Sequence, residues 1–221
     1  MLPSFLSDQE SAGSHRRDGR RSAPGSLGMG KEGWIAVMEE VELCDDRLYL
    51  RPPRLGDAGQ IYAACQDAEI QRWTAVPSPY SRADAEMFAT DLVPTGWSTG
   101  HSAILGVFDR GGDRLLAMIG LHDIEEREAA QGGRAELGYW CAPWARDKGV
   151  VTDAGRLVCR WAFDELGLAR IDWYAAVGNH PSRRVAEKIG FAIEGIQRLR
   201  IVQRGERQDA WAGGLLREDL R

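Results

Sequence analysis

The chain has 221 residues, a formal net charge of −5 and 43% hydrophobic residues, which suits one domain of moderate size with a tail. It contains no apolar run near the roughly 18 residues that a spanning helix needs, and its N-terminus lacks the features of a signal peptide, so we expect a cytoplasmic protein with no membrane partner. Its four cysteines are scattered, which argues against a zinc site or a disulfide framework and predicts no metal.

The acidic excess lies outside the first part of the chain. Residues 1–32 hold five basic and four acidic side chains, so the remainder is more acidic than the whole. An acidic body is a poor surface for nucleic acid, which needs clustered Lys and Arg, and it suits an amine-bearing partner. Residues 7–30 are rich in Ser, Gly and Arg and lack apolar periodicity. We therefore predict a disordered leader at residues 1–37 and a single domain at residues 38–221.

The sequence from residue 48 to residue 121 predicts one strand, two helices and a hairpin. Residues 48–51 alternate between apolar and polar side chains, as a short strand does. Asp57 heads a helix with one apolar face, and a capping box at Ser81 opens a second helix. Residues 102–108 and 115–121 flank a Gly-Gly turn and are expected to pair as a hairpin.

The sequence from residue 135 to residue 216 predicts two strands that alternate with two helices, followed by a hairpin. A strand at residues 135–140 precedes a helix whose expected N-cap is Thr152. A strand at residues 170–176 then leads to a helix that begins near Pro181 and ends at Gly190. A final hairpin is expected to pair residues 191–202 with residues 208–216. Together these elements predict a mixed α/β (α+β) domain, with helices packed on a largely antiparallel sheet.

The loop before Thr152 has the features of an anion site. Arg146, Lys148 and Gly149 precede a helix N-terminus, where backbone N–H groups and the helix dipole favour a phosphate. The loop lacks the G-K-[ST] sequence of a P-loop, and the chain lacks the G-x-G-x-x-G sequence of a dinucleotide-binding fold. An ordinary turn with solvated charges is the alternative interpretation.

Four segments resemble the GCN5-related N-acetyltransferases (GNAT), and within them the ribosomal-protein N-acetyltransferase (RimJ/RimL-type) branch. They are LRPPRLGDA at residues 50–58, IGLHDI at 119–124, AELGYW at 135–140 with RDKG at 146–149, and NHPS at 179–182 with EKIGF at 187–191. The resemblance runs from about residue 48 to residue 216. It implies a GNAT-type fold, with a central twisted sheet of about seven mostly antiparallel strands and about four flanking helices. It also implies acetyl-CoA, or another short acyl-CoA, as co-substrate.

The same resemblance assigns residues to the co-substrate. It places the diphosphate on the loop that follows Arg146, the pantetheine arm along the strand that ends near residue 142, and a serine near the thioester sulfur. The residues implied are Trp140, Cys141, Ala142, Arg146, Asp147, Lys148, Gly149, Val150, Val151, Thr152, Asn179 and Ser182. At Val151 the chain departs from the pattern, which has a small residue there.

Acyl transfer to an amine needs a general base, donors for the oxyanion and often a proton for the leaving thiolate. Glu136, on the strand that leads to the loop, is the first candidate base, and His122 is the second; either residue has a structural role as its alternative. Ser182 is the candidate acid for the thiolate, or else a first-turn helix residue. The candidate acceptor contacts are Asp123, Trp73 and Trp97. We expect both tryptophans in loops, where they line the acceptor pocket or anchor the loops.

Two functions follow from these observations. The first is an acyl-CoA-dependent N-acyltransferase that carries acetyl to a primary amine, either a small molecule or a protein N-terminus, by direct attack in a ternary complex. The second is a non-catalytic acyl-CoA-binding regulator with the same fold. The acceptor, the acyl group and the choice between monomer and homodimer stay open at this point.

Overall fold

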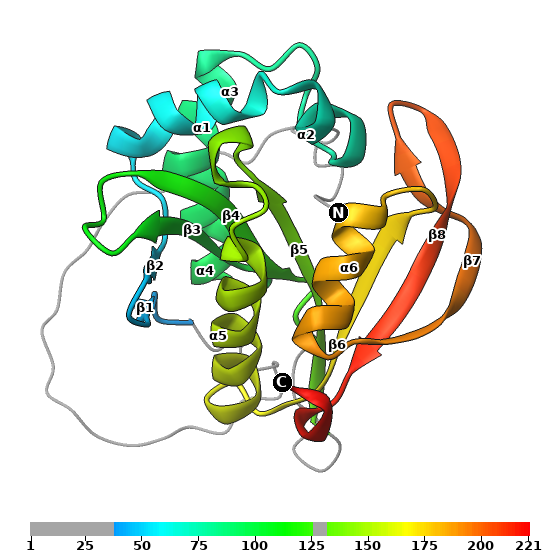
Figure 1. The fold of residues 1–221 in the computed structure, drawn as a ribbon. Coiled ribbons are helices and arrows are strands. Elements are labelled where there is room, and N and C mark those ends of the chain that lie inside the picture. The colour runs from blue at the N-terminus through cyan, green and yellow to red at the C-terminus, as the bar shows by residue number, and fades with distance from the viewer. Residues whose placement is uncertain (1–37, 126–131) are drawn as a thin grey trace, which may run out of the picture. The chain divides into compact units, whose positions relative to one another are not determined.

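An eight-stranded sheet forms the centre of residues 38–125 and 132–221, the residues that the computed structural model describes (Figure 1). The strand order is β1-β2-β3-β4-β5-β6-β8-β7, and all neighbours are antiparallel except β5 and β6. The strands are β1 (Leu43–Cys44), β2 (Leu48–Arg51), β3 (Ala103–Asp109), β4 (Leu115–His122), β5 (Gly133–Cys141), β6 (Leu168–Ala176), β7 (Ala192–Gln203) and β8 (Glu206–Leu215). The predicted leader, residues 1–37, lies outside the described residues.

Six α-helices accompany the sheet within the described residues. They are α1 (Ala58–Cys65), α2 (Ala68–Trp73), α3 (Arg82–Met87), α4 (Val93–Ser98), α5 (Val150–Asp164) and α6 (His180–Ile189). A π-helical turn, Phe88–Leu92, joins α3 to α4. Side chains of Asp67, Ser81 and Asn179 accept N–H groups in the first turns of α2, α3 and α6, which explains where these helices begin. None of the described helices is long and apolar enough to span a bilayer.

The structure has more elements than the sequence pattern predicts. The strand β1 and the helix α2 were not predicted, because two and six residues are too few to show a period. The second predicted helix continues to Ser98, since Pro94 lies at the start of α4, where a missing N–H group costs no helical hydrogen bond. Trp73 and Trp97 therefore lie in α2 and α4, and the prediction that they occupy loops is wrong.

The start of α5 also differs from the prediction. The helix begins at Val150, and its N-cap is Gly149, which has φ of 76° in the left-handed region. Thr152 is thus the third residue of the helix and not its cap. The predicted stop of α6 at Gly190 is confirmed: its φ is 131°, and an added Cβ would lie 2.1 Å from the carbonyl oxygen of Asp219.

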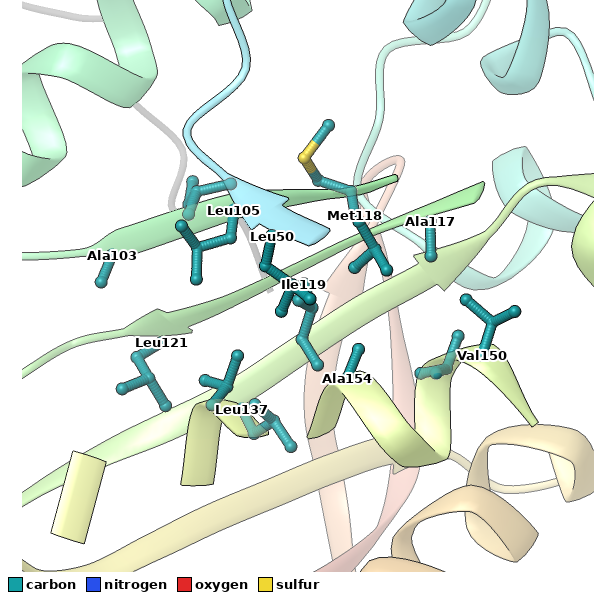
Figure 2. Packing of buried hydrophobic residues seen from close by; sticks show 14 of the residues in the cluster. Leu50, Ala103, Leu105, Ala117, Met118, Ile119, Leu121, Leu137, Val150 and Ala154 are labelled. Carbon is teal, nitrogen blue, oxygen red and sulfur yellow. The ribbon is translucent and has the colours of Figure 1, made fainter. Parts of the chain in front are cut away.

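The helices cover both faces of the sheet. Helix α5 packs on β4, β5 and β6, and α4 packs on β3; in Figure 1, α5 and α6 lie in front of the sheet and α4 lies behind it. Alternate side chains of each strand point to opposite faces. Figure 2 shows Ile119, Leu121 and Leu137 on the side of Ala154 in α5, whereas Met118 points to the opposite side. We call these the α5 face and the α4 face.

The strands β5 and β6 separate partway along their length. They pair in parallel only between Gly133–Glu136 and Leu168–Asp172. Beyond Glu136, β5 continues along β4 as far as Cys141, and β6 continues along β8 as far as Ala176, so the two strands diverge (Figure 1). This divergence leaves a slot in the middle of the sheet, with strand edges that lack a neighbour.

Candidate active site

A pocket of about 630 Å³ occupies the slot between β5 and β6. Residues from the divergent parts of both strands line it, among them Trp140 of β5 and Tyr174 of β6. One part of its wall is the N-terminus of α5, from Gly149 to Thr152, and another part comes from α2, α3 and the π-helical turn. The slot therefore joins a helix N-terminus to a hollow on the α4 face.

The N-terminus of α5 is a ready anion site. The first helical hydrogen bond runs from the N–H group of Asp153 to the carbonyl oxygen of Gly149, at 3.0 Å. The N–H groups of the three residues between them have no acceptor within the helix, and no described side chain caps this end. An added Cβ at Gly149 would meet only Asp153 Oδ2, at 3.8 Å, so there is space for a side chain. The preference for glycine here comes from the left-handed φ.

Two arginines hold this loop in place. Arg146 lines the pocket and pairs with Asp67, the N-cap residue of α2. Burial raises the pKa of Asp67, but the hydrogen bonds from Arg146 and from backbone N–H groups outweigh burial and lower it. Arg47 donates to the carbonyl oxygen of Lys148 at 2.9 Å and to Asp153 Oδ2 at 2.8 Å. The loop conformation thus depends on groups distant in the sequence.

Of the two cations predicted for this end, Arg146 lines the pocket and Lys148 does not. Lys148 does not line the pocket, because its Nζ donates to the carbonyl oxygen of Trp144 at 2.8 Å. Arg184 and Lys188 of α6 do line it, and sequence reasoning missed both. Their i, i+4 spacing on a correctly predicted helix was the signal that could have found them, since it places two cations on one face.

The pocket lining includes most of the residues predicted for the pantetheine arm. Trp140, Cys141 and Asn179 line the pocket. Ala142 does not, because it is buried and its N–H group donates to the carbonyl oxygen of Leu116 at 2.9 Å. Burial raises the pKa of Cys141 to about 11, so this thiol stays protonated at neutral pH and is a poor nucleophile.

Ser182 belongs to a buried network of hydrogen bonds. Its Oγ donates to the hydroxyl of Tyr139 at 3.0 Å and accepts from Nε1 of Trp173 at 3.3 Å. The Tyr139 hydroxyl donates to the carbonyl oxygen of Ser182 at 2.9 Å, and burial raises the pKa of Tyr139. Both residues line the pocket, and both hydroxyls stay protonated at neutral pH. Sequence reasoning missed Tyr139, for which only strand alternation carried a signal.

Glu136 and His122 lie side by side on the α4 face. They are register partners on β5 and β4, both are buried, and both line the pocket. Burial lowers the pKa of His122 to about 3, so the imidazole is neutral and a weak base; its ordinary pKa, on which its candidacy rested, does not hold here. Next to them, Gly120 and Gly138 are also register partners, and both line the pocket.

The structure does not bring the three predicted acceptor contacts together. Trp73 lines the pocket, and its Nε1 donates to Glu69 at 2.9 Å. Trp97 is fully buried in the core, where it packs on Trp161 with ring centroids 5.9 Å apart, and it lines no part of the pocket. Asp123 is exposed, forms an ion pair with His101 at 3.3 Å and also lies outside the pocket lining.

Other side chains complete the acceptor end. Met87, Phe88, Leu92 and Met118 give it apolar walls that sequence reasoning did not identify. The π-helical turn carries two of these four residues, which fits the frequent use of such turns at functional sites. Within residues 38–125 and 132–221, no group of three His, Cys, Asp or Glu side chains is arranged to hold a metal ion.

Comparison with known proteins identifies the family. Residues 47–192 match the model described as the acetyltransferase (GNAT) domain. YdaF of Bacillus subtilis (strain 168), which carries the provisional name of a ribosomal N-acetyltransferase, is 39% identical over 105 residues, or 48% of this chain and 55% of YdaF. The chain thus matches about half the length of that relative.

Two solved structures share the fold at low identity. Mycobacterium smegmatis RimJ, in complex with CoA-disulfide, has a TM-score of 0.70 at 20% identity, over 82% of this chain and 88% of RimJ. The microcin C7 self-immunity acetyltransferase MccE, in complex with acetyl-CoA and AMP, has a TM-score of 0.69 at 20% identity, over 78% of this chain and 93% of MccE. With its family match, its sheet and its divergent central strands, the chain belongs to the acetyltransferase (GNAT) family.

Proposed function

We propose that this protein transfers an acetyl group from acetyl-CoA to a primary amine, by direct attack in a ternary complex. The observation that carries the proposal is that one pocket joins the N-terminus of α5, the edge of β5 and the buried carboxylate of Glu136. These three features are what a diphosphate, an extended amide chain and an amine each need. Complexes of RimJ with CoA-disulfide and of MccE with acetyl-CoA support the same choice.

The residues present fit acetyl-CoA. The first-turn N–H groups of α5 suit a diphosphate, and Arg184 and Lys188 add positive charge beside it. At Trp140 and Cys141, the edge of β5 that faces β6 is not paired with a strand. This edge suits the amides of pantetheine, much as a free strand edge suits an added strand. When bound, acetyl-CoA supplies a thioester whose carbonyl carbon an amine can attack.

We assign the chemical roles from the geometry around the slot. Glu136 takes the proton that the acceptor ammonium must lose before its nitrogen can attack. The neutral His122 beside it adds no charge that would compete with the ammonium. Ser182 donates to the sulfur as it leaves, once its O–H turns away from the Tyr139 hydroxyl, while Trp173 still donates to its Oγ. Holding amine and thioester together in the slot contributes much of the acceleration.

The acceptor enters from the α4 face. Trp73, Phe88 and Met118 shape an apolar hollow there, while Glu69 and Asp84 place carboxylates on its wall. An amine that is protonated in water and attached to an apolar group fits both properties. A protein N-terminus meets this description, and the provisional name of YdaF points to the same kind of acceptor; a small apolar amine meets it equally.

The test uses the purified chain, acetyl-CoA and a panel of peptides and small amines, with release of free thiol as the readout. We expect Glu136→Gln to lower kcat by about 10²- to 10⁴-fold, the usual contribution of a general base, and to leave acetyl-CoA affinity unchanged. Glu86→Gln, a change at an exposed carboxylate of α3, is the matched control and keeps full activity. A wild-type chain that binds acetyl-CoA but acetylates no amine would favour the regulator instead.

A further inference from the structure

The strand β7 contains a strained bulge. Its register with β8 shifts between Gln197 and Ile201, and within the shift Leu199 has φ of 53°, a left-handed conformation that a leucine rarely adopts. Two side chains of β8 hold it: Asp209 Oδ1 accepts the N–H group of Leu199 at 2.9 Å, and Arg207 donates to its carbonyl oxygen at 3.2 Å. A strained bulge that its neighbours hold in place commonly redirects a side chain near a functional site.

The residue redirected here is Arg200. Its guanidinium lies 4.4 Å from the ring centroid of Tyr174 on β6, and its Nη2 lies 3.7 Å from Oε2 of Glu136 on β5. Since the strand order is β5-β6-β8-β7, this side chain reaches past β8 from the edge of the sheet. Ala212 of β8, the register partner of Tyr174, has only a methyl group as its side chain.

We propose that Arg200 is a positioning residue for the acetyl transfer, which holds the Glu136 carboxylate in place for proton acceptance. This inference rests on the proposed function. Stacking on Tyr174 fixes the guanidinium plane, and the ion pair fixes one carboxylate oxygen of Glu136. Arginine is always charged and is less strongly hydrated than lysine, so it suits a half-buried ion pair of this kind.

Other described titratable and charged groups lie near Glu136 on its own strand and on the elements packed against it. On β5, Arg134 pairs with Glu125 at 2.7 Å and lies 4.0 Å from Asp172. On β4, His122 is neutral, because burial lowers its pKa to about 3. On β6, Asp172 is a register partner of Glu136 and is negative, with Arg170 donating to it at 2.6 Å. The pocket wall contributed by α2 and α3 adds two more carboxylates, Glu69 and Asp84. Arg200 therefore brings a positive charge to a region that contains several carboxylates.

The test compares Arg200→Met and Arg200→Lys with Arg198→Met, an exposed arginine of the same strand, in the full chain. We expect Arg200→Met to lower kcat on the order of 10-fold, as the loss of a partly exposed ion pair allows, and to leave the Kd for acetyl-CoA unchanged. The acid limb of its kcat profile moves to higher pH, because the variant lacks the positive charge beside the carboxylate. Arg200→Lys restores part of the loss, and Arg198→Met matches the wild type.

A second variant keeps Arg200 and disturbs only its support. Asp209→Ala removes the acceptor that holds Leu199, so we expect the same displacement of the acid limb, with unchanged acetyl-CoA binding as evidence of folding. A pH profile of Arg200→Met that coincides with that of Arg198→Met overturns the inference, as does a rise in acceptor KM with no change in kcat. A wild-type chain inactive on every amine overturns the proposed function and this inference together.

Discussion

Gly149 offers the sharpest test of the co-substrate site. Its φ of 76° disfavours any residue with a Cβ, yet an added Cβ has room, since it would meet only Asp153 Oδ2 at 3.8 Å. Gly149→Ala therefore costs about 1 kcal/mol of stability from the backbone alone, and adds only an uncharged methyl group. Gly149→Glu has the same backbone cost, and in addition places a carboxylate where the first-turn N–H groups of α5 would hold a diphosphate.

The two substitutions separate electrostatics from strain. Two like unit charges about 4 Å apart repel by about 4 kcal/mol at an effective dielectric constant of about 20. Solvent at the pocket mouth screens part of this repulsion, and the remaining loss of about 2.7 kcal/mol corresponds to about 100-fold weaker binding. We therefore expect Gly149→Glu to raise the Kd for CoA by at least about 100-fold, and Gly149→Ala to change it by less than about 3-fold.

Titration of CoA by calorimetry, or by the fluorescence of Trp140 in the pocket wall, measures both constants. The free energy of unfolding in urea, recorded in parallel, shows whether both variants carry the same backbone cost. Equal CoA affinity in Gly149→Glu and Gly149→Ala would refute the placement of the diphosphate at the N-terminus of α5. An affinity loss in both variants that follows their stability would instead assign the effect to backbone strain.

Two further predictions concern stability. Trp97→Ala removes a fully buried ring and should lower the free energy of unfolding by about 3–5 kcal/mol, while the folded fraction keeps its CoA affinity. A variant with wild-type stability and lost CoA affinity would instead indicate that Trp97 belongs to the binding site. Burial raises the pKa of Asp57, but hydrogen bonds from Arg51 and from the N–H group of Arg54 outweigh burial and lower it overall. Asp57 thus contributes stability that is present above its unfolded pKa of about 4 and is lost as the pH falls through its lower folded pKa. Thermal unfolding between about pH 5 and pH 2 should show a shallower pH dependence in Asp57→Asn than in the wild type, and equal slopes would contradict this account.

The strand, loop and helix around the anion site were predictable because their signals are local. Strand alternation predicted that Glu136 lies on the face opposite Leu137. The position of Gly149 before an amphipathic run predicted the N-terminus of α5 to within a few residues. Capping at Ser81 and the stop at Gly190 depend on side chains and backbone angles only a few positions apart. Spacing along the chain carries this kind of information.

The partners of these groups were not predictable in the same way. Arg146 pairs with Asp67, 79 residues away, so a cation predicted to face a phosphate is shared with the cap of α2. Trp97 was expected in a loop because it lies close to Pro94, yet it belongs to α4 and its side chain is buried in the core. Which face of a helix is buried depends on what packs against it, and local sequence does not contain that.

The sequence by itself determined the order of the main elements, their amphipathic faces and the family resemblance, since each rests on residues a few positions apart. Only the tertiary structure decided which groups share the slot. It lowers the pKa of His122 by burial, removes Ala142 and Lys148 from the pocket, and brings Arg200 from the edge strand to Glu136. Burial and long-range pairing are properties of the packed chain, and they set the charge and the shape of this site.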